Sequence, residues 1–221
     1  MTGGVVVLGA TGSVGRQALD VLRARGERPR ILTANRDAAG LAALCREFLP
    51  DECVIGDDGY KALKLLLADT PVRVSAGRES LCRAAALPGR PVVLNAVVGV
   101  GGLLPTLAAI RAGNTVALAN KETLVAYGTQ VMRESRAHNA PILPVDSEHS
   151  AIFQCLRGEE GNGVRRLLLT ASGGPFYGKT RDELRAVTPA LALAHPSWRM
   201  GPKITVDSST LMNKGFEIIE A

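Results

Sequence analysis

Two carboxylates stand two positions apart about two thirds of the way along this 221-residue chain. Asp146 and Glu148 lie in a segment of sequence Val-Asp-Ser-Glu-His-Ser, directly after a short apolar run. In an extended chain side chains alternate between two sides, so we expect both carboxylates to face one cation. The alternative is structural: an Asp that caps a helix over residues 150–156 and a Glu in its first turn.

A third carboxylate occurs near the end of the sequence. The residues from Ser208 onward predict a helix with Asn213 and Glu217 one turn apart and Lys214 three residues before Glu217. One helix face would then carry an amide, an ammonium group and a carboxylate, although an ordinary Lys–Glu pair gives the same pattern. Ser172, in a Ser-Gly-Gly turn, offers a hydroxyl suited to binding an anion.

A Pro- and Gly-containing segment, His195-Pro-Ser-Trp-Arg-Met-Gly201, holds the only tryptophan, Trp198, and one of three histidines. A single histidine is more often structural than catalytic. A loop of this composition that carries Trp198 and Met200 is nevertheless typical of a lid that covers a ligand and excludes water.

A glycine-rich turn follows the first apolar run. Its sequence, Gly9-Ala-Thr-Gly-Ser-Val-Gly15, lies between a predicted strand and a predicted helix. Glycines are needed where the backbone turns tightly and approaches a pyrophosphate, so the pattern favours a dinucleotide site over a turn without a ligand. The expected contact residues are Gly9, Thr11, Gly12, Ser13 and Val14.

The end of the second predicted strand indicates which dinucleotide binds. NAD enzymes place Asp or Glu there for the ribose 2′-hydroxyl, whereas this chain has Ala34, Asn35 and Arg36. A guanidinium group suits a 2′-phosphate, which favours NADPH. The alternative is a solvated Arg36 that pairs with Asp37.

Tyr60 and Lys64 match the Tyr-x-x-x-Lys dyad of short-chain dehydrogenases. That dyad lies far downstream in its family, whereas Tyr60 falls in the region of the third strand and its helix. We therefore assign both residues to a solvent-facing helix.

The elements that must position these residues alternate along the chain. We expect strands at residues 4–8, 29–32, 72–74, 92–94, 115–118 and 142–143, and helices at 17–25, 38–48, 60–68 and 122–136. This alternation predicts an α/β fold, a Rossmann-like doubly wound parallel sheet. Beyond residue 143 we expect a strand at 164–170, Gly/Pro-rich loops and the final helix. An NADPH-binding domain over 1–150 and a partial α/β catalytic domain over 151–221 are therefore predicted.

Composition narrows the class of protein. Apolar residues make up 46% of the chain, which excludes disorder. The net charge of +5 suits small anionic ligands, while the scarcity of aromatic residues and of basic blocks argues against nucleic acid. Four cysteines without a CxxC pair fit reduced thiols in a cytoplasmic protein. We expect neither a signal peptide nor a membrane span, because Asn95, Pro105 and three glycines interrupt the uncharged stretch 91–110.

Taken together, these motifs resemble one family, the 1-deoxy-D-xylulose 5-phosphate reductoisomerases, which are NADPH-dependent enzymes of the methylerythritol phosphate route to isoprenoids. The similar segments are residues 9–15, 118–125, 145–154, 170–176, 195–201 and 207–217. Only the first of these segments is shared widely with other families.

The resemblance implies an activity and a set of site residues. The reaction would be a rearrangement by retro-aldol and aldol steps, then hydride transfer to give 2-C-methyl-D-erythritol 4-phosphate. The implied metal is Mg²⁺ or Mn²⁺, with Co²⁺ as a further candidate, on Asp146, Glu148 and Glu217. The implied phosphate contacts are Ser172, Ser208, Asn213 and Lys214, and the other substrate contacts are Ser147, Glu148, Glu217, His195 and Trp198. Asn120, Lys121 and Glu122 would contact the cofactor, and Lys121, Glu148 and His195 would be catalytic.

The family continues beyond the position of Ala221 with more of the catalytic domain, a linker and a helical domain, and suggests a homodimer. We therefore expect a fragment or a shortened form that binds cofactor and has little activity. Two other hypotheses stay open. A dehydrogenase of the aspartate-semialdehyde or homoserine type shares the first domain but leaves the three carboxylates unexplained. A non-catalytic dinucleotide-binding module would bind NADPH tightly without turnover.

Overall fold

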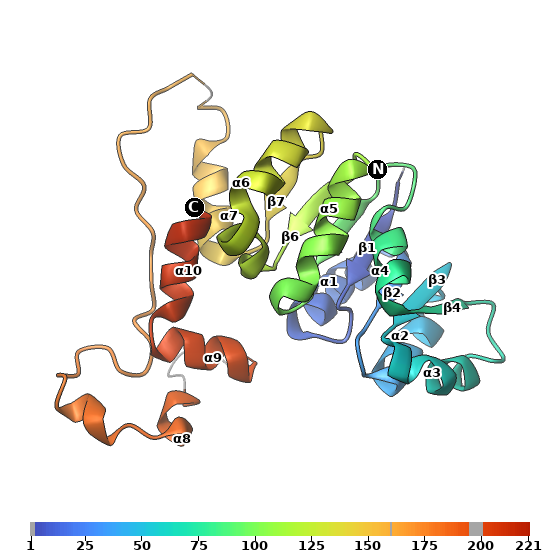
Figure 1. Ribbon diagram of the computed structural model, residues 1–221, viewed down its shortest axis with the longest axis horizontal. Helices are drawn as coiled ribbons and strands as arrows, with labels where there is room; N and C mark the ends of the chain where they lie inside the picture. The colour runs from blue at the N-terminus through green and yellow to red at the C-terminus, as the bar shows by residue number, and fades with distance from the viewer. Residues whose placement is uncertain (1–2, 160, 195–200) are drawn as a thin grey trace. The chain divides into compact units, whose positions relative to one another are not determined.

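The computed structural model describes residues 3–159, 161–194 and 201–221 (Figure 1). Contacts divide the chain into two compact units, Met1–Asp146 and Ser147–Ala221. The division falls near the change in sequence texture around residue 150. The roles assigned to the two parts, NADPH binding and catalysis, remain predictions.

The first unit is built on a parallel sheet of seven strands. The strands are β1 Val5–Leu8, β2 Pro29–Thr33, β3 Glu52–Ile55, β4 Arg73–Ala76, β5 Val92–Asn95, β6 Thr115–Leu118 and β7 Ile142–Pro144. Their order is β4-β3-β2-β1-β5-β6-β7, so the chain builds outward from β1 to β4 and then returns to the other side of β1. Ligands of such sheets bind beyond the carboxyl ends of the strands where the order reverses, here between β1 and β5.

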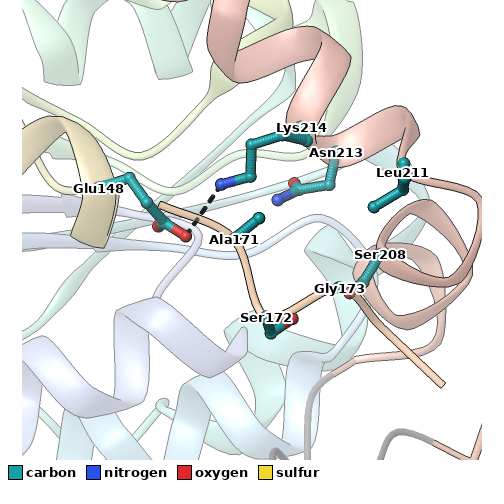
Figure 2. Close-up of a pocket in the computed structure, with 8 residues that line it drawn as sticks. All are labelled: Glu148, Ala171, Ser172, Gly173, Ser208, Leu211, Asn213 and Lys214. Carbon is teal, nitrogen blue, oxygen red and sulfur yellow. Dashed lines mark hydrogen bonds and ion pairs between the residues drawn. The ribbon is translucent and has the colours of Figure 1, made fainter. Parts of the chain in front are cut away.

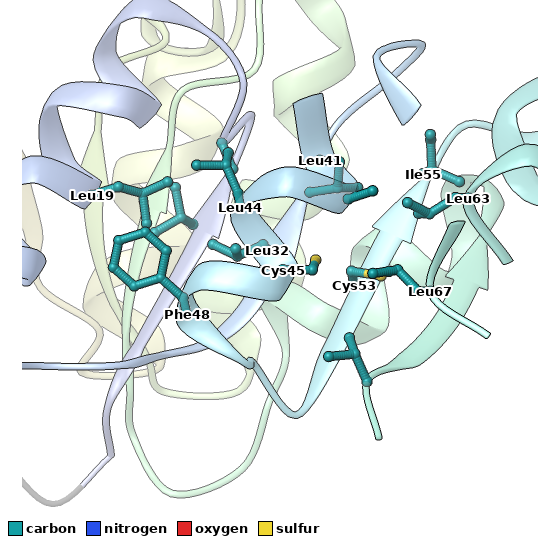
Figure 3. Close-up of a cluster of buried hydrophobic side chains, with 14 of the residues drawn as sticks. Leu19, Leu32, Leu41, Leu44, Cys45, Phe48, Cys53, Ile55, Leu63 and Leu67 are labelled. Carbon is teal, nitrogen blue, oxygen red and sulfur yellow. The ribbon is translucent and has the colours of Figure 1, made fainter. Parts of the chain in front are cut away.

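Helices cover both faces of this sheet (Figure 1). They are α1 Ser13–Ala24, α2 Ala38–Phe48, α3 Tyr60–Leu66, α4 Gly77–Ala85, α5 Leu103–Arg111 and α6 Lys121–Ala137. One buried cluster joins α1, α2 and α3 to strand residues that include Val7 (Figure 3). A second cluster joins α4, α5 and α6 to strand residues that include Val6. Since successive strand residues are buried on opposite faces, the strands are continuously apolar, and the prediction of a doubly wound α/β fold is confirmed.

Strand β3 is not among the predicted strands, because it begins with a charged residue. Glu52 is buried, and its carboxylate accepts hydrogen bonds from Arg73 Nη2 and Ser75 Oγ, each at 2.6 Å. Both donors come from β4, the neighbouring strand in the sheet. A cross-strand pairing therefore compensates the buried charge, and a sequence pattern cannot reveal it.

The described residues of the second unit form helices joined by irregular segments, without strands. Its elements are α7 Ser147–Leu156, a 3₁₀ turn at Glu183–Ala186, α8 Pro189–Ala192, α9 Pro202–Ser209 and α10 Met212–Glu220. The predicted strand at 164–170 is wrong: these residues are irregular, and Leu168 is 73% exposed. A strand needs a neighbouring strand to complete its backbone hydrogen bonds, and none of the described strands pairs with this segment.

The final helix does not begin at Ser208, contrary to the sequence pattern. Ser208 lies in α9, and Leu211 then adopts the left-handed conformation, with φ of 59°, before α10 starts. This break separates Ser208 from the helix that carries Asn213, Lys214 and Glu217. None of the described helices is long and apolar enough to cross a membrane.

Candidate nucleotide and metal sites

The glycine turn after β1 has no room for side chains at two positions. Gly9 has φ of +83°, and a Cβ atom there would lie 2.7 Å from the Ala96 carbonyl oxygen. A Cβ at Gly15 would lie 2.2 Å from the Gly9 carbonyl oxygen, so α1 packs directly on the turn. Thr33 of β2 holds the turn by accepting hydrogen bonds from Gly9 N at 3.1 Å and from Ala10 N at 2.7 Å.

Helix α1 starts immediately after this turn. Its N-cap is Gly12, and no side chain in the described structure caps it. The first amide groups of a helix lack partners within the helix and carry partial positive charge. The turn and the helix start therefore form a backbone site suited to a phosphate group.

Arg36 lies just beyond β2 and is exposed, as is Asn35. Asp37 does not pair with it: the Asp37 carboxylate caps α2 through Gly40 N at 2.8 Å and lies 3.9 Å from Arg16 Nη2. Within the described part of the chain Arg36 makes no ion pair. The pairing with Asp37 is therefore not observed, and a solvated Arg36 stays open as the alternative to a 2′-phosphate contact.

The start of α6 carries three residues that the sequence assigns to the cofactor. Asn120 is buried and caps the helix by accepting a hydrogen bond from Thr123 N at 2.9 Å. Lys121 follows and pairs closely with Asp146, the last residue of the first unit, with both side chains 13% exposed. Glu122 lies in the first helical turn. The Lys121–Asp146 pair places an ammonium group and a carboxylate together near the carboxyl ends of β6 and β7.

Within the second unit, Lys214 of α10 joins two carboxylates. Its Nζ atom lies 3.1 Å from Glu148 Oε1 (Figure 2). The same atom contacts Glu217 and the Thr170 carbonyl oxygen. Burial lowers the pKa of Lys214, but the hydrogen bonds to Glu217 and Glu148 outweigh it and leave this pKa above its ordinary value. The ammonium group is therefore charged where the two carboxylates meet.

The two glutamates are close enough to share a cation. Carboxylate oxygens of Glu148 and Glu217 lie within 4.8 Å of each other, and Glu217 is fully buried. Asn213 Nδ2 donates to Glu217 Oε1 at 2.6 Å and orients it. Glu148 stands in the first turn of α7, so the argument from an extended chain is wrong for this residue. Asp146 precedes Glu148 by two residues in the chain.

A pocket beside this cluster collects all four residues predicted to hold phosphate (Figure 2). It is lined by Glu148, Ala171, Ser172, Gly173, Ser208, Leu211, Asn213 and Lys214. The Ser172-Gly-Gly turn of the second unit approaches α9 closely, since a Cβ at Gly174 would lie 2.7 Å from the Ser208 carbonyl oxygen. Ser147 Oγ donates to Glu148 Oε2 at 2.5 Å. Hydroxyl, amide and ammonium groups thus converge on one small cavity.

His149 is a residue that the sequence patterns did not single out. Its ring is buried, with Nε2 3.1 Å from the Glu217 carbonyl oxygen and Nδ1 3.7 Å from Glu220 Oε2. The His149 ring therefore links α7 to α10 beside Glu148 and Glu217. The only signal in the sequence is its position next to Glu148. The predicted site residues His195 and Trp198, and also Met200, lie outside the described residues.

The fold and these sites define a class: an α/β protein with a phosphate-binding glycine turn where a parallel sheet reverses its order, and a separate lysine–carboxylate pocket. Residues 5–128 match the family model of 1-deoxy-D-xylulose 5-phosphate reductoisomerase, and residues 142–221 match the model of the C-terminal domain of that enzyme. The chain therefore belongs to the 1-deoxy-D-xylulose 5-phosphate reductoisomerase family.

Individual relatives agree with this family. The 1-deoxy-D-xylulose 5-phosphate reductoisomerase of Bacteroides fragilis is 51% identical over 220 residues, which are 98% of this chain and 57% of the relative. A crystal structure of DOX-P reductoisomerase in complex with NADPH, fosmidomycin and magnesium has a TM-score of 0.91 and 39% identity, over 98% of this chain and 57% of the other. The enzyme from Zymomonas mobilis in complex with NADPH has a TM-score of 0.90 and 43% identity, over 100% of this chain and 57% of the other. The chain thus spans 57% of the length of these relatives.

Proposed function

We propose that this protein carries out the NADPH- and divalent-metal-dependent rearrangement and reduction of 1-deoxy-D-xylulose 5-phosphate to 2-C-methyl-D-erythritol 4-phosphate, in the cytoplasm and as a homodimer. The observation that carries the proposal is the pocket in which Lys214, Glu148, Ser172 and Ser208 meet. Anion-binding groups there adjoin a pair of carboxylates suited to a cation. Family membership supplies the reaction, since the relatives are named for it.

The first unit would bind NADPH in the manner of a Rossmann domain. Gly9 and Gly15 leave no room for a Cβ atom, which fits a tight turn whose backbone must approach a pyrophosphate. Gly12, Thr11, Ser13 and Val14 would complete the turn, and Arg36, with Ala34 and Asn35, would bind the 2′-phosphate. NADPH supplies the hydride for the reduction when it is bound.

Asp146, Glu148 and Glu217 would hold one divalent cation. The donor set consists of carboxylate oxygens, which fits Mg²⁺ or Mn²⁺ and extends to Co²⁺. The ion pairs of Lys214 with Glu148 and Glu217 support the proposal that positive charge is favoured here. The chemistry that the cation would supply is polarisation of the carbonyl and neighbouring hydroxyl oxygens of the substrate, as retro-aldol and aldol steps would need.

The remaining residues would bind and orient the substrate. Ser172, Ser208, Asn213 and Lys214 would hold its phosphate, since all four line the same pocket. Ser147, which hydrogen-bonds Glu148, would contact the carbon chain.

Lys121 would hold a proton at Nζ near the reacting centre, kept charged by Asp146. Asn120 and Glu122 would contact the cofactor beside it. His195 and Trp198 would close over the substrate.

The test is an initial-rate assay on this chain joined to the C-terminal region of a relative, since the chain spans 57% of the length of its relatives. The assay follows NADPH oxidation and identifies the product by mass spectrometry. We expect 2-C-methyl-D-erythritol 4-phosphate only when NADPH, the ketose phosphate and Mn²⁺ are all present. Glu148→Gln should lower turnover at least about tenfold, and Glu159→Gln, an exposed carboxylate on the loop after α7, should leave it unchanged.

Other outcomes identify the competing functions. Equal rates with and without metal would favour a simple dehydrogenase and contradict the proposal. Tight NADPH binding with no turnover under any of these conditions would favour a non-catalytic binding module.

A further inference from the structure

The segment after β5 is held by a buried side-chain amide from the connection between β6 and α6. Asn120, just before α6, donates from Nδ2 to the carbonyl oxygens of Val97 at 2.6 Å and Gly99 at 2.8 Å. Residues 96–102, here called the β5 loop, include the 3₁₀ turn Gly99–Gly102. The Asn120 side chain therefore ties the β5 loop to the helix that begins with Lys121.

All polar atoms of the Asn120 side chain are occupied by protein. Its Oδ1 atom accepts hydrogen bonds from Thr123 N at 2.9 Å and from Thr123 Oγ1, and the residue is 2% exposed. A Cβ atom at Gly102 would lie 2.8 Å from Asn120 Cγ, so the loop packs against the amide itself. The side chain therefore acts on a ligand through the loop, and a direct contact of Asn120 with the cofactor would come from its backbone.

A second amide holds the same loop from inside. Asn95, the last residue of β5, is fully buried and donates to the Gly102 carbonyl oxygen at 2.9 Å and to Thr106 Oγ1 at 2.7 Å. Its Oδ1 atom accepts from Val97 N at 3.1 Å. The loop is thus anchored at both ends, by a strand and by a helix N-terminus.

The anchored loop borders the glycine turn. The Ala96 carbonyl oxygen is the atom that a Cβ at Gly9 would meet at 2.7 Å. Farther along, the loop exposes two apolar side chains, Val98 at 74% and Val100 at 73%. An apolar surface that is held rigidly beside a phosphate-binding turn suits a planar, weakly polar ring.

The strand order indicates which part of a dinucleotide would reach this surface. The adenosine ribose binds at the end of β2 and the pyrophosphate at the turn after β1. Because β5 lies on the other side of β1 from β2, the nicotinamide half extends toward the β5 loop.

We propose that Asn120 is a positioning residue that holds the β5 loop in the shape that receives the nicotinamide half of NADPH. This inference rests on the proposed NADPH site.

The test compares two ligands, NADPH and 2′,5′-ADP, which contains only the adenosine half. Asn120→Asp keeps an N-cap acceptor for Thr123 but removes both donors to the loop, leaving carbonyl groups without partners. We expect NADPH affinity to fall about tenfold and 2′,5′-ADP affinity to stay within about twofold. Gly102→Ala, which pushes a methyl group against the amide, should give the same selective loss.

The matched control is Asn114→Asp. Asn114 is also a fully buried asparagine that donates to two carbonyl oxygens, those of Ala85 at 2.9 Å and Leu87 at 3.0 Å, away from the β5 loop. Its NADPH and 2′,5′-ADP affinities should both stay within about twofold of the unaltered protein.

Three results would overturn the inference: unchanged NADPH affinity in both loop variants, an equal loss of both ligands, or a selective loss of NADPH in Asn114→Asp. If the unaltered protein binds neither ligand, the proposed function fails instead.

Discussion

Lys214 sets the charge of the pocket in the second unit. One ammonium group faces the carboxylates of Glu148 and Glu217, so these three groups together carry a net negative charge. A buried carboxylate is costly unless it is paired, and Glu217 is fully buried. Positive charge is therefore stabilised here, and a divalent cation would more than offset the remaining negative charge.

Glu217→Gln removes one of the carboxylates without changing its size. We expect Mn²⁺ affinity, measured by titration calorimetry, to fall at least about tenfold, with NADPH affinity unaltered. The matched control is Glu183→Gln, an exposed carboxylate in the same unit that accepts hydrogen bonds from Thr180. Unaltered Mn²⁺ affinity in Glu217→Gln would show that this residue is not a ligand.

Arg36→Ala tests the choice of dinucleotide. Because Arg36 is exposed at the end of β2 and Asp37 is committed to α2 and Arg16, its guanidinium group is available for a 2′-phosphate. Losing a charge-assisted contact should weaken NADPH binding by about one to two decades and leave NADH binding unchanged. Arg133→Ala, an exposed arginine on α6, should change neither affinity. Equal affinities for the two dinucleotides in the unaltered protein would refute the preference.

Helix α1 depends on a glycine for its contact with the turn. A methyl group at Gly15 would meet the Gly9 carbonyl oxygen at 2.2 Å, so Gly15→Ala must push the helix away from the sheet. We expect a loss of about 1–3 kcal/mol in the free energy of unfolding, measured in urea. Gly128→Ala in α6, where a Cβ meets nothing within 4 Å, should be neutral or stabilising. Equal effects of the two substitutions would contradict the close packing of α1.

The connection from α2 to β3 contains an acid-sensitive ion pair. Hydrogen bonding from Arg30, together with Arg28, holds the pKa of Asp51 below its ordinary value. A lowered native pKa stabilises the fold above the pKa of the unfolded chain, and this contribution disappears as the pH falls through the native pKa. Asp51→Asn should therefore cost up to about 1 kcal/mol near neutral pH and nothing in strong acid. A cost that is independent of pH would contradict this assignment.

The sequence predicts elements well where local pattern and burial agree. The apolar spacing of residues 38–48 gives α2 its observed bounds, and the glycine turn is found where expected. Prediction from the sequence fails where residues far apart in the chain determine the secondary structure. Residues 164–170 have the composition of a strand but no neighbouring strand, and the left-handed Leu211 divides a segment that looks like one helix.

The candidate site shows the same limit. The sequence identifies Lys214 and Glu217 on one helix face, but it cannot show that Lys214 reaches Glu148, 66 residues away, or that His149 contacts the Glu217 backbone. Such contacts depend on tertiary packing, which a local pattern does not encode. The buried amide of Asn120 is hidden for the same reason, since its partners lie 21 and 23 residues earlier.

At the scale of the molecule, the chain consists of two units with different chemistry. The first offers a backbone phosphate site at the reversal point of the sheet, and the second offers the lysine–carboxylate pocket. The reaction proposed above would use both. The central claim is therefore that one protein binds NADPH through the first unit and a divalent cation through Glu148 and Glu217 of the second.

Anomalous diffraction from crystals grown with Mn²⁺ and NADPH tests this claim most directly. The account predicts one manganese peak with carboxylate oxygens of Asp146, Glu148 and Glu217 at about 2.0–2.2 Å. It also predicts a pyrophosphate on the Gly9–Gly15 turn in the same crystal. A manganese peak bound by other residues, or NADPH bound away from the turn, would contradict the account.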